Sequence, residues 1–194
     1  MIKFTNYISE VSNIDWRGCL MLTMPDEISR LISAWSDSHI DKKFLAGDGR
    51  ESYSHCTVLY GFDQDTNIDT VENQLNSYSP IDLTLGCVKR FPASEHRPDS
   101  DCIVIEVNAS KQLRDLHTNL KDIFSVKTTF PTYNPHITIA YIKPGSLQHL
   151  DGDVSFDGFN VKSNEMTYST GSSENRSRKA LTFEEFQAKN QILA

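Results

Sequence analysis

Two segments of this chain carry the same pattern: residues 55–60 read His-Cys-Thr-Val-Leu-Tyr, and residues 136–141 read His-Ile-Thr-Ile-Ala-Tyr. Successive side chains of a strand point to opposite faces, so a histidine and the threonine two positions later point the same way. Each segment therefore presents an imidazole beside a hydroxyl. The other four histidines lack the pattern. The repetition predicts an internal duplication that brings His55, Thr57, His136 and Thr138 to one pocket.

A strand and a helix are predicted before each of the two segments. The apolar run Gly18–Met24 is typical of a buried strand, and a helix begins at Pro25–Asp26 with Trp35 on its apolar face. Residues Ile103–Val107 predict a second buried strand, and Ser110 is a good N-cap for the helix that follows. The order strand, helix, His-x-Thr strand therefore occurs twice.

The remaining segments are predicted by the same rules. Residues 36–54 are polar and contain two glycines, which predicts a long loop. Residues 68–75 predict a helix, and residues 80–91, 154–161 and 165–169 predict strands. Strict alternation places Tyr60 and Tyr141 on the face opposite the histidines, as packing residues.

The domain organisation predicted is one bilobal domain over residues 1–170, followed by a tail over residues 171–194. The polar run at residues 171–179 is typical of a flexible connector. Thr182 as N-cap with Glu185 three positions on, and Leu181 placed against Phe186, predicts a C-terminal helix. This helix either packs on the body or closes over a ligand as a lid.

Composition limits the partners. The 194 residues are 38% hydrophobic, which is enough for a core, and carry a net charge of −7. Binding to long nucleic acid depends on many Lys and Arg contacts to phosphates, so an acidic chain favours a small anionic ligand instead. We expect no membrane partner, because no segment is long and apolar enough to span a bilayer, and no signal peptide is recognisable, which favours the cytoplasm. The oligomeric state is not indicated.

Two histidines beside two threonines suit the cleavage of an RNA-type phosphodiester. One histidine can take the proton of the 2′ hydroxyl while the other protonates the departing 5′ oxygen, because an imidazole titrates near neutral pH. The threonine hydroxyls can donate to the non-bridging oxygens. A zinc site is disfavoured, since Cys56 points away from His55 and Thr57 and catalytic zinc takes three protein ligands. We therefore expect neither a metal nor another cofactor.

Four cysteines lie at positions 19, 56, 87 and 102, within apolar runs and without the paired spacing of a zinc site. We expect buried free thiols. No Gly-x-Ser-x-Gly turn and no Gly-rich phosphate loop is present in the sequence, which disfavours a serine nucleophile and a nucleoside triphosphatase.

The duplicated motif resembles the 2H phosphoesterase superfamily. Within it, the segments 18–25, 55–61 and 134–141 are most similar to the phage anti-CBASS nucleases. The resemblance covers roughly residues 16–145. It implies an α+β bilobal fold, with two antiparallel sheets and outer helices around a central cleft. One departure is that Ser54 precedes the first motif, whereas Pro135 precedes the second, as is common in the family.

This resemblance also implies an activity. The family's enzymes need no metal and cleave 3′-5′ linkages of cyclic di- or trinucleotide messengers, such as 3′,3′-cyclic GMP-AMP, by attack of the 2′ hydroxyl. A phage would thereby evade the immune response of its bacterial host, in the host cytoplasm. An RNA 2′,3′-cyclic phosphodiesterase and a non-catalytic protein that sequesters the messenger are the alternatives. Which histidine is base and which is acid stays open.

Four residues are candidates for substrate binding. A nucleotide base needs an aromatic platform, and Trp16 and Phe91 flank predicted strands of the site. Each of the two is equally compatible with a role in the core or at the rim. Tyr133, just before the second motif, and Lys143, just after it, are within reach of a ligand; Lys143 also fits a solvated strand end.

Overall fold

The computed structural model describes residues 18–63, 66–75, 78, 80–95, 97–124, 126, 132–170 and 177–182. Its helices are α2 (Asp26–His39), α3 (Ile68–Leu75) and α4 (Lys111–Ile123), with short 3-10 turns η1 (Lys42–Phe44) and η2 (Gln148–Leu150). Its strands are β1 (Gly18–Thr23), β2 (Leu45–Arg50), β3 (His55–Phe62), β4 (Ile81–Phe91), β5 (Asp101–Asn108), β6 (His136–Ile142), β7 (Asn160–Ser163), β8 (Glu165–Thr170) and β9 (Ser177–Thr182). None of these helices is both long and apolar enough to cross a membrane.

The strands form an antiparallel sheet in the order β7-β4-β5-β6-β3-β1-β8-β9, and β2 pairs with the end of β6. The order has two halves of four strands, which meet where β6 lies beside β3. Each half contains the predicted unit: β1, α2 and β3 in one, and β5, α4 and β6 in the other. The predicted α+β class and the duplication are confirmed, and the sheets of the two halves are hydrogen bonded to each other through the two motif strands.

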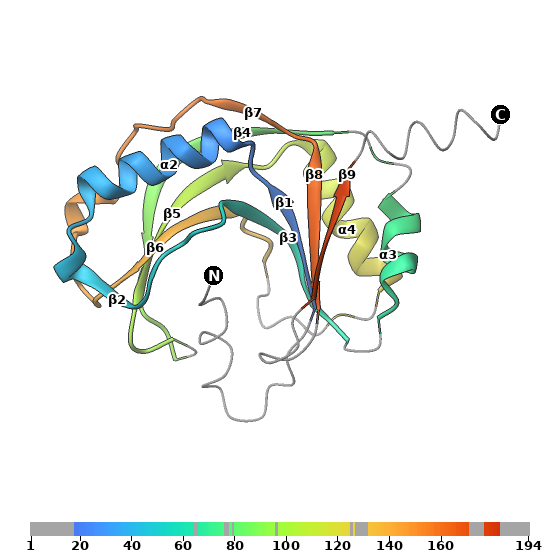
Figure 1. The fold of residues 1–194 in the computed structure, drawn as a ribbon, viewed down its shortest axis with the longest axis horizontal. Helices are drawn as coiled ribbons and strands as arrows, with labels where there is room; N and C mark the ends of the chain where they lie inside the picture. Colours follow the sequence, from blue (N-terminus) through green and yellow to red (C-terminus); the bar gives the residue numbers. More distant parts are fainter. Residues whose placement is uncertain are drawn as a thin grey trace.

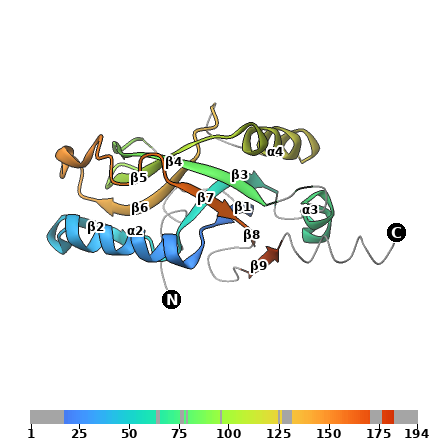
Figure 2. The ribbon, with the colours of Figure 1, turned by 90° about the horizontal axis from the view of Figure 1, so that it is seen from above.

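The strands bend into an arch, with α2 outside the bend at one side and α3 and α4 outside it at the other (Figures 1 and 2). The main core lies between these helices and the outer face of the sheet. Helix α2 contributes Ile32 and Trp35 to it, and α4 contributes Leu113, Leu116 and Leu120, at the spacing of one helix face. The outer face of the sheet is therefore buried in the main core, and the motif side chains lie on the inner face.

Helix α4 begins where the sequence predicts. The Ser110 hydroxyl accepts a hydrogen bond from the backbone N–H of Leu113 at 3.1 Å, which satisfies one of the donors left open at a helix start. Helix α2 lacks a side-chain cap, but Asp26 and Glu27 lie in its first turn and His39 in its last. The two carboxylates interact favourably with the positive, N-terminal end of the helix dipole.

Strand β6 contains a bulge directly after its motif threonine. Its register with β5 passes from Thr138 opposite Val104 to Ala140 opposite Ile103, so Ile139 has no partner in the register. Such an extra residue shifts all later side chains to the other face of the strand.

Strand β3 has a bulge at the matching place. Its register with β1 skips Val58, between Thr57 and Leu59, and Val58 and Leu59 both lie in the main core. After each bulge the tyrosine that ends the motif turns toward the histidine side. The expectation that Tyr60 and Tyr141 face away from the histidines is therefore wrong.

The packing of Tyr141 supports this orientation. Tyr141 belongs to a small second cluster with Cys102 and Val104, separate from the main core. Val104 pairs with Thr138 across the sheet, so the cluster lies on the inner face, beside the motif. On β3, Tyr60 pairs with Cys19 of β1.

Several predicted boundaries are wrong. Residues 36–54 are not one loop, because α2 continues to His39 and β2 pairs with β6. The strand predicted at 154–161 begins only at Asn160; turns precede it, with positive φ angles at Gly152 and Gly158. Residues 177–179, predicted as connector, belong to β9, which pairs with β8 along its length. The predicted C-terminal helix and the lid role lie outside the described residues.

The cysteines agree with the sequence analysis. All four are free thiols; Cys19, Cys56 and Cys102 are buried and Cys87 is half-buried. Burial among apolar neighbours raises the pKa of Cys56 to about 12 and that of Cys102 to about 11. Thiols with such pKa values are protonated near neutral pH, so neither is an activated nucleophile.

Candidate active site

The four motif side chains meet where the two halves of the sheet join. Cys56 of β3 lies opposite Ile137 of β6 in the antiparallel register, and both are fully buried in the main core. One step along each strand, this register sets His55 opposite Thr138 and Thr57 opposite His136. Because neighbours of Cys56 and Ile137 point to the other face, two histidines and two threonines share one patch of the inner face.

Each histidine is held by the carbonyl two residues before it. The Nδ1–H of His55 donates to the Tyr53 carbonyl at 2.6 Å, and the Nδ1–H of His136 donates to the Asn134 carbonyl at 2.8 Å. A carbonyl oxygen can only accept, so Nδ1 carries the hydrogen in both rings. The atom that gains or loses a proton is therefore Nε2 in both histidines. The two rings are prepared for the same kind of proton transfer.

A cluster of hydroxyls lies beside His55, which is itself buried at 5% exposure. The Tyr53 hydroxyl is 2.9 Å from the Thr23 hydroxyl and 2.8 Å from the Thr167 hydroxyl, and the two threonine hydroxyls are 3.1 Å apart. Thr23 pairs with His55 across β1 and β3, and the Tyr53 ring lies 6.0 Å from the imidazole. These neighbours of His55 are polar and uncharged.

The surroundings of His136 are different. Phe91, at the end of β4, packs its ring edgewise against the imidazole, with centroids 5.0 Å apart. Desolvation is the main cause that lowers the pKa of His136; the positive charge of Arg97 lowers it further, and the bond to Asn134 acts in the opposite direction. His136 therefore favours its neutral form more than an ordinary histidine does.

Arg97 comes from the hairpin between β4 and β5. Its guanidinium lies 5.8 Å from the Tyr141 ring, in a cation–π contact, and its Nε donates to the Ser100 carbonyl at 3.0 Å. The bulge in β6 is what turns Tyr141 toward this arginine. A positive charge is therefore present near the second motif of an otherwise acidic chain.

The structure places the predicted substrate-binding residues unequally. Phe91 contacts His136, as described above. Tyr133 stacks on His117 of α4, with centroids 3.9 Å apart and planes at 6°, and its hydroxyl donates to the Thr57 carbonyl at 3.1 Å. Lys143 is exposed and lies beyond the end of β6 opposite to His136. Trp16 lies outside the described residues.

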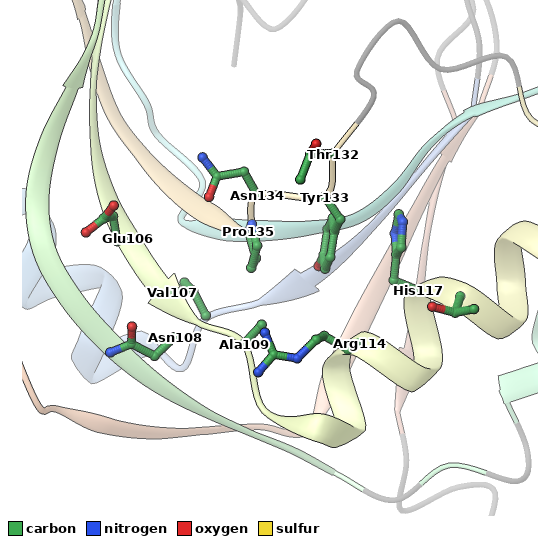
Figure 3. Close-up of a pocket in the computed structure, with 11 residues that line it drawn as sticks. Glu106, Val107, Asn108, Ala109, Arg114, His117, Thr132, Tyr133, Asn134 and Pro135 are labelled. Carbon is green, nitrogen blue, oxygen red and sulfur yellow. The ribbon is translucent and has the colours of Figure 1, made fainter.

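A cavity of about 500 Å³ (Figure 3) adjoins the second motif, because Pro135, directly before His136, and Glu106, opposite His136 in the register, are among its lining residues. Its walls are the end of β5, the first turns of α4 and the segment that leads into β6. The residues that line it are Glu106, Val107, Asn108, Ala109, Arg114, His117, Thr118, Thr132, Tyr133, Asn134 and Pro135. Its volume is large enough for a small organic ligand.

Sequence reasoning missed several of these residues. Tyr53 could have been found, because it precedes His55 by two positions and so points to the same side of an extended chain. Arg97 and His117 had no such signal. His117 donates from Nδ1 to the Val58 carbonyl at 2.7 Å, at the bulge in β3, and a bulge is not visible in an apolar run.

No group of three or more His, Cys, Asp or Glu side chains is arranged to hold a metal ion in the ranges that the structure describes. The histidines and threonines of the two motifs share one patch of the inner face. Acid and base catalysis by imidazoles and donation by hydroxyls are what this arrangement can perform.

Comparison with known proteins agrees with the fold and the motif. Residues 24–149 match the family model described as the 2′-5′ RNA ligase superfamily. The chain therefore belongs to this superfamily, whose members are the 2H phosphoesterases, and it is an enzyme of the phosphodiesterase class. A search of curated protein sequences gave no match.

Solved structures show the same fold at low sequence identity. LigT of E. coli, in complex with phosphate, has a TM-score of 0.58 and 16% identity, covering 86% of this chain and 98% of LigT. TT0787 of Thermus thermophilus has a TM-score of 0.56 and 12% identity, covering 85% and 94%. Usb1 of Kluyveromyces marxianus has a TM-score of 0.55 and 12% identity, covering 86% and 97%.

Proposed function

We propose that this chain cleaves 3′-5′ phosphodiester linkages of small cyclic di- or trinucleotide messengers, such as 3′,3′-cyclic GMP-AMP. The observation that carries the proposal is the matched pair of histidines on adjacent strands, each fixed through Nδ1 by the carbonyl two residues before it. The two Nε2 atoms supply a base and an acid, which is what attack by an internal 2′ hydroxyl requires.

The reaction proceeds by transfer of the phosphoryl group within one ribose unit. The base takes the proton of the 2′ hydroxyl, the 2′ oxygen bonds to phosphorus, and the bond from phosphorus to the 5′ oxygen of the next nucleotide breaks. The acid gives its proton to that 5′ oxygen. The ring opens to a linear product that ends in a 2′,3′-cyclic phosphate, and Thr57 and Thr138 donate hydrogen bonds to the non-bridging oxygens.

We assign the base to His136 and the acid to His55. The base has to be neutral when substrate arrives, and desolvation beside Phe91 together with Arg97 holds the pKa of His136 below its usual value of 6.5. His55, the other imidazole of the pair, is then the acid, and the hydroxyl cluster of Tyr53 lies beside it.

Several features support a small nucleotide as substrate. The net charge of −7 disfavours a long RNA strand. Phe91 lies against His136, where it can stack on a base, and the adjoining cavity of about 500 Å³ has room for one nucleoside unit. The role in evasion of a bacterial antiviral response rests on the resemblance of the motif segments to the phage anti-CBASS nucleases. The host cytoplasm is then the place of action.

An RNA end that carries a 2′,3′-cyclic phosphate is the second candidate substrate. The name of the matching family, the 2′-5′ RNA ligase superfamily, favours it. A protein that sequesters the messenger uncut is the third candidate. It is disfavoured because binding alone does not require two histidines of matched tautomer.

One experiment separates the three candidates. The purified chain is incubated in EDTA with 3′,3′-cyclic GMP-AMP, with an RNA that ends in a 2′,3′-cyclic phosphate and with a linear dinucleotide, and products are resolved by chromatography. We expect fastest cleavage of the cyclic dinucleotide and a product with a 2′,3′-cyclic phosphate. Preference for the RNA end, or tight binding of cyclic GMP-AMP without turnover, would contradict the proposal.

The variants His55→Ala and His136→Ala test the site in the same assay, and both are expected to be inactive. His149→Ala is the matched control, because His149 is an exposed histidine in η2, outside the site. Full activity in either motif variant would exclude the assignment of the catalytic pair.

A further inference from the structure

The cavity lies next to His136, one of the two histidines between which we place the reacting phosphate. Glu106 of β5 pairs with His136 across the sheet, and Pro135 directly precedes His136. A ligand whose phosphate lies between the two histidines therefore has an adjacent group within reach of this cavity. In a nucleotide, that adjacent group is the ribose with its base.

Two opposite charges line the cavity from different walls. The Glu106 carboxylate belongs to β5 and the Arg114 guanidinium to the first turns of α4 (Figure 3). Among the residues that the structure describes, neither side chain has a hydrogen bond or an ion pair, with each other or with a third group. A carboxylate accepts and a guanidinium donates, so the cavity is suited to a ligand that offers donors on one edge and acceptors on another.

Two stacked rings also line the cavity, on the side away from Glu106 (Figure 3). The rings are those of Tyr133 and His117, and both are fixed: the Tyr133 hydroxyl donates to the Thr57 carbonyl, and His117 Nδ1 donates to the Val58 carbonyl. Figure 3 shows these two rings side by side, with Arg114 below them and Asn134 above and to the left of Tyr133. A rigid aromatic wall favours a planar ligand, since it loses little freedom on binding.

We propose that this cavity is a subsite for a guanine base. Guanine offers two adjacent donors, N1–H and the N2 amino group, to the two oxygens of Glu106, and it offers acceptors O6 and N7 to the guanidinium of Arg114. Adenine would place its N1 acceptor against the carboxylate and is rejected for that reason. A pyrimidine lacks N7 and the second ring needed to reach both walls. The inference rests on the proposed function, in which a nucleotide phosphate lies at the histidines.

Binding of mononucleotides tests the subsite without any cleavage. GMP and AMP are titrated into the intact chain by isothermal calorimetry, and we expect tighter binding of GMP. Glu106→Gln and Arg114→Gln are each expected to weaken GMP by about 10-fold to 100-fold and AMP by much less, because a bidentate contact that discriminates a base is worth about 1–3 kcal/mol. Equal binding of GMP and AMP by the unmodified chain, or equal losses for both in the variants, would overturn the proposal.

Matched controls and a second readout keep the outcomes distinct. Asp157→Asn and Arg30→Gln change exposed charges outside the cavity and are expected to leave GMP binding unchanged. In the cleavage assay, Glu106→Gln should lower kcat/KM for 3′,3′-cyclic GMP-AMP more than for cyclic di-AMP. If the chain binds GMP preferentially through Glu106 but cleaves neither cyclic dinucleotide, the guanine subsite is retained and the proposed function is overturned. If it cleaves cyclic dinucleotides without base preference, the proposed function is retained and the guanine subsite is overturned.

Discussion

The two halves of the site have the same backbone design and different neighbours. In both, a histidine is fixed by the carbonyl two residues before it, a threonine follows on the same face, and a bulge turns a tyrosine back toward the histidine side. His55 then lies among the hydroxyls of Tyr53, Thr23 and Thr167, whereas His136 lies against Phe91 and near the charge of Arg97.

This difference separates what the backbone does from what the neighbours do. The strand and the carbonyl two residues before each histidine determine the tautomer and the direction of each imidazole, and they do so equally in both halves. The neighbours act on the protonation equilibrium, where Phe91 and Arg97 favour a neutral His136. One duplicated unit can thus supply both an acid and a base.

Removal of either imidazole has the largest expected effect. We expect His55→Asn and His136→Asn each to lower kcat for 3′,3′-cyclic GMP-AMP by about 10²-fold to 10⁴-fold, the range for loss of a general acid or base. The double variant should be only slightly slower than the worse single variant, because groups that act as one unit are not additive. Initial rates of the three variants measure this. A double variant slowed by the product of the two single effects would mean that the two halves act independently.

The threonines test whether the halves are equivalent in binding the phosphate. Thr57→Val and Thr138→Val each remove one hydroxyl, and we expect each to lower kcat by about 10²-fold, as loss of one oxyanion donor does. Near-equal losses would indicate that both hydroxyls face the non-bridging oxygens. Steady-state kinetics are the measurement, and circular dichroism checks the fold. An unchanged kcat in one variant would restrict that role to a single half.

The hydroxyl cluster of Tyr53, Thr23 and Thr167 lies beside His55, so removal of one of its hydroxyls should affect catalysis by His55. Tyr53→Phe keeps the ring beside His55 and removes the hydroxyl that lies 2.9 Å from Thr23 and 2.8 Å from Thr167. A neutral hydrogen bond contributes about 1 kcal/mol, so we expect a fall in kcat/KM of about 5-fold. Tyr78→Phe, outside the motif strands, serves as control. A rate equal to that of the unmodified chain would exclude the cluster from catalysis.

The smallest expected effect is a shift in the pH dependence of kcat/KM. If His136 is the base, kcat/KM rises with pH as that imidazole loses its proton, and the midpoint of the rise lies below 6.5 because its pKa is lowered. Arg97→Gln removes a positive charge that disfavours the protonated ring, so the pKa of His136 rises and the midpoint moves to higher pH. The profiles of both proteins, with Lys162→Gln on β7 as control, test this. A midpoint that moves to lower pH would contradict the assignment of the base.

The fold and the meeting of the four motif side chains were predictable because they depend on local patterns. Alternation placed His55 with Thr57 and His136 with Thr138, and repeated strand-helix-strand order predicted the duplication. Alternation failed for Tyr60 because it assumes that no residue is inserted in the strand. In the sequence Val58 and Leu59 are two members of an apolar run, and only the structure shows that both lie in the main core.

Other parts of the site depend on contacts that no local pattern records. Arg97 lies in a hairpin turn, and its position near Tyr141 follows from the register of three strands. Strand β9 was missed because its residues are mostly polar, and an edge strand needs no apolar face to pair with its neighbour. The cavity at Glu106 and Arg114 is formed by a strand end and a helix start that are adjacent only in the folded chain.

The carbonyls of Tyr53 and Asn134 give this site a property that a Ser-His-Asp triad does not have. Each imidazole is oriented by its own backbone, so neither needs a carboxylate, and each can hold or release a proton at Nε2 with equal geometry. By microscopic reversibility, the histidine that acts as acid in ring opening acts as base in ring closure. The same four side chains can therefore catalyse transesterification in both directions, and the concentrations of the cyclic and linear nucleotides, not the protein, determine which direction prevails.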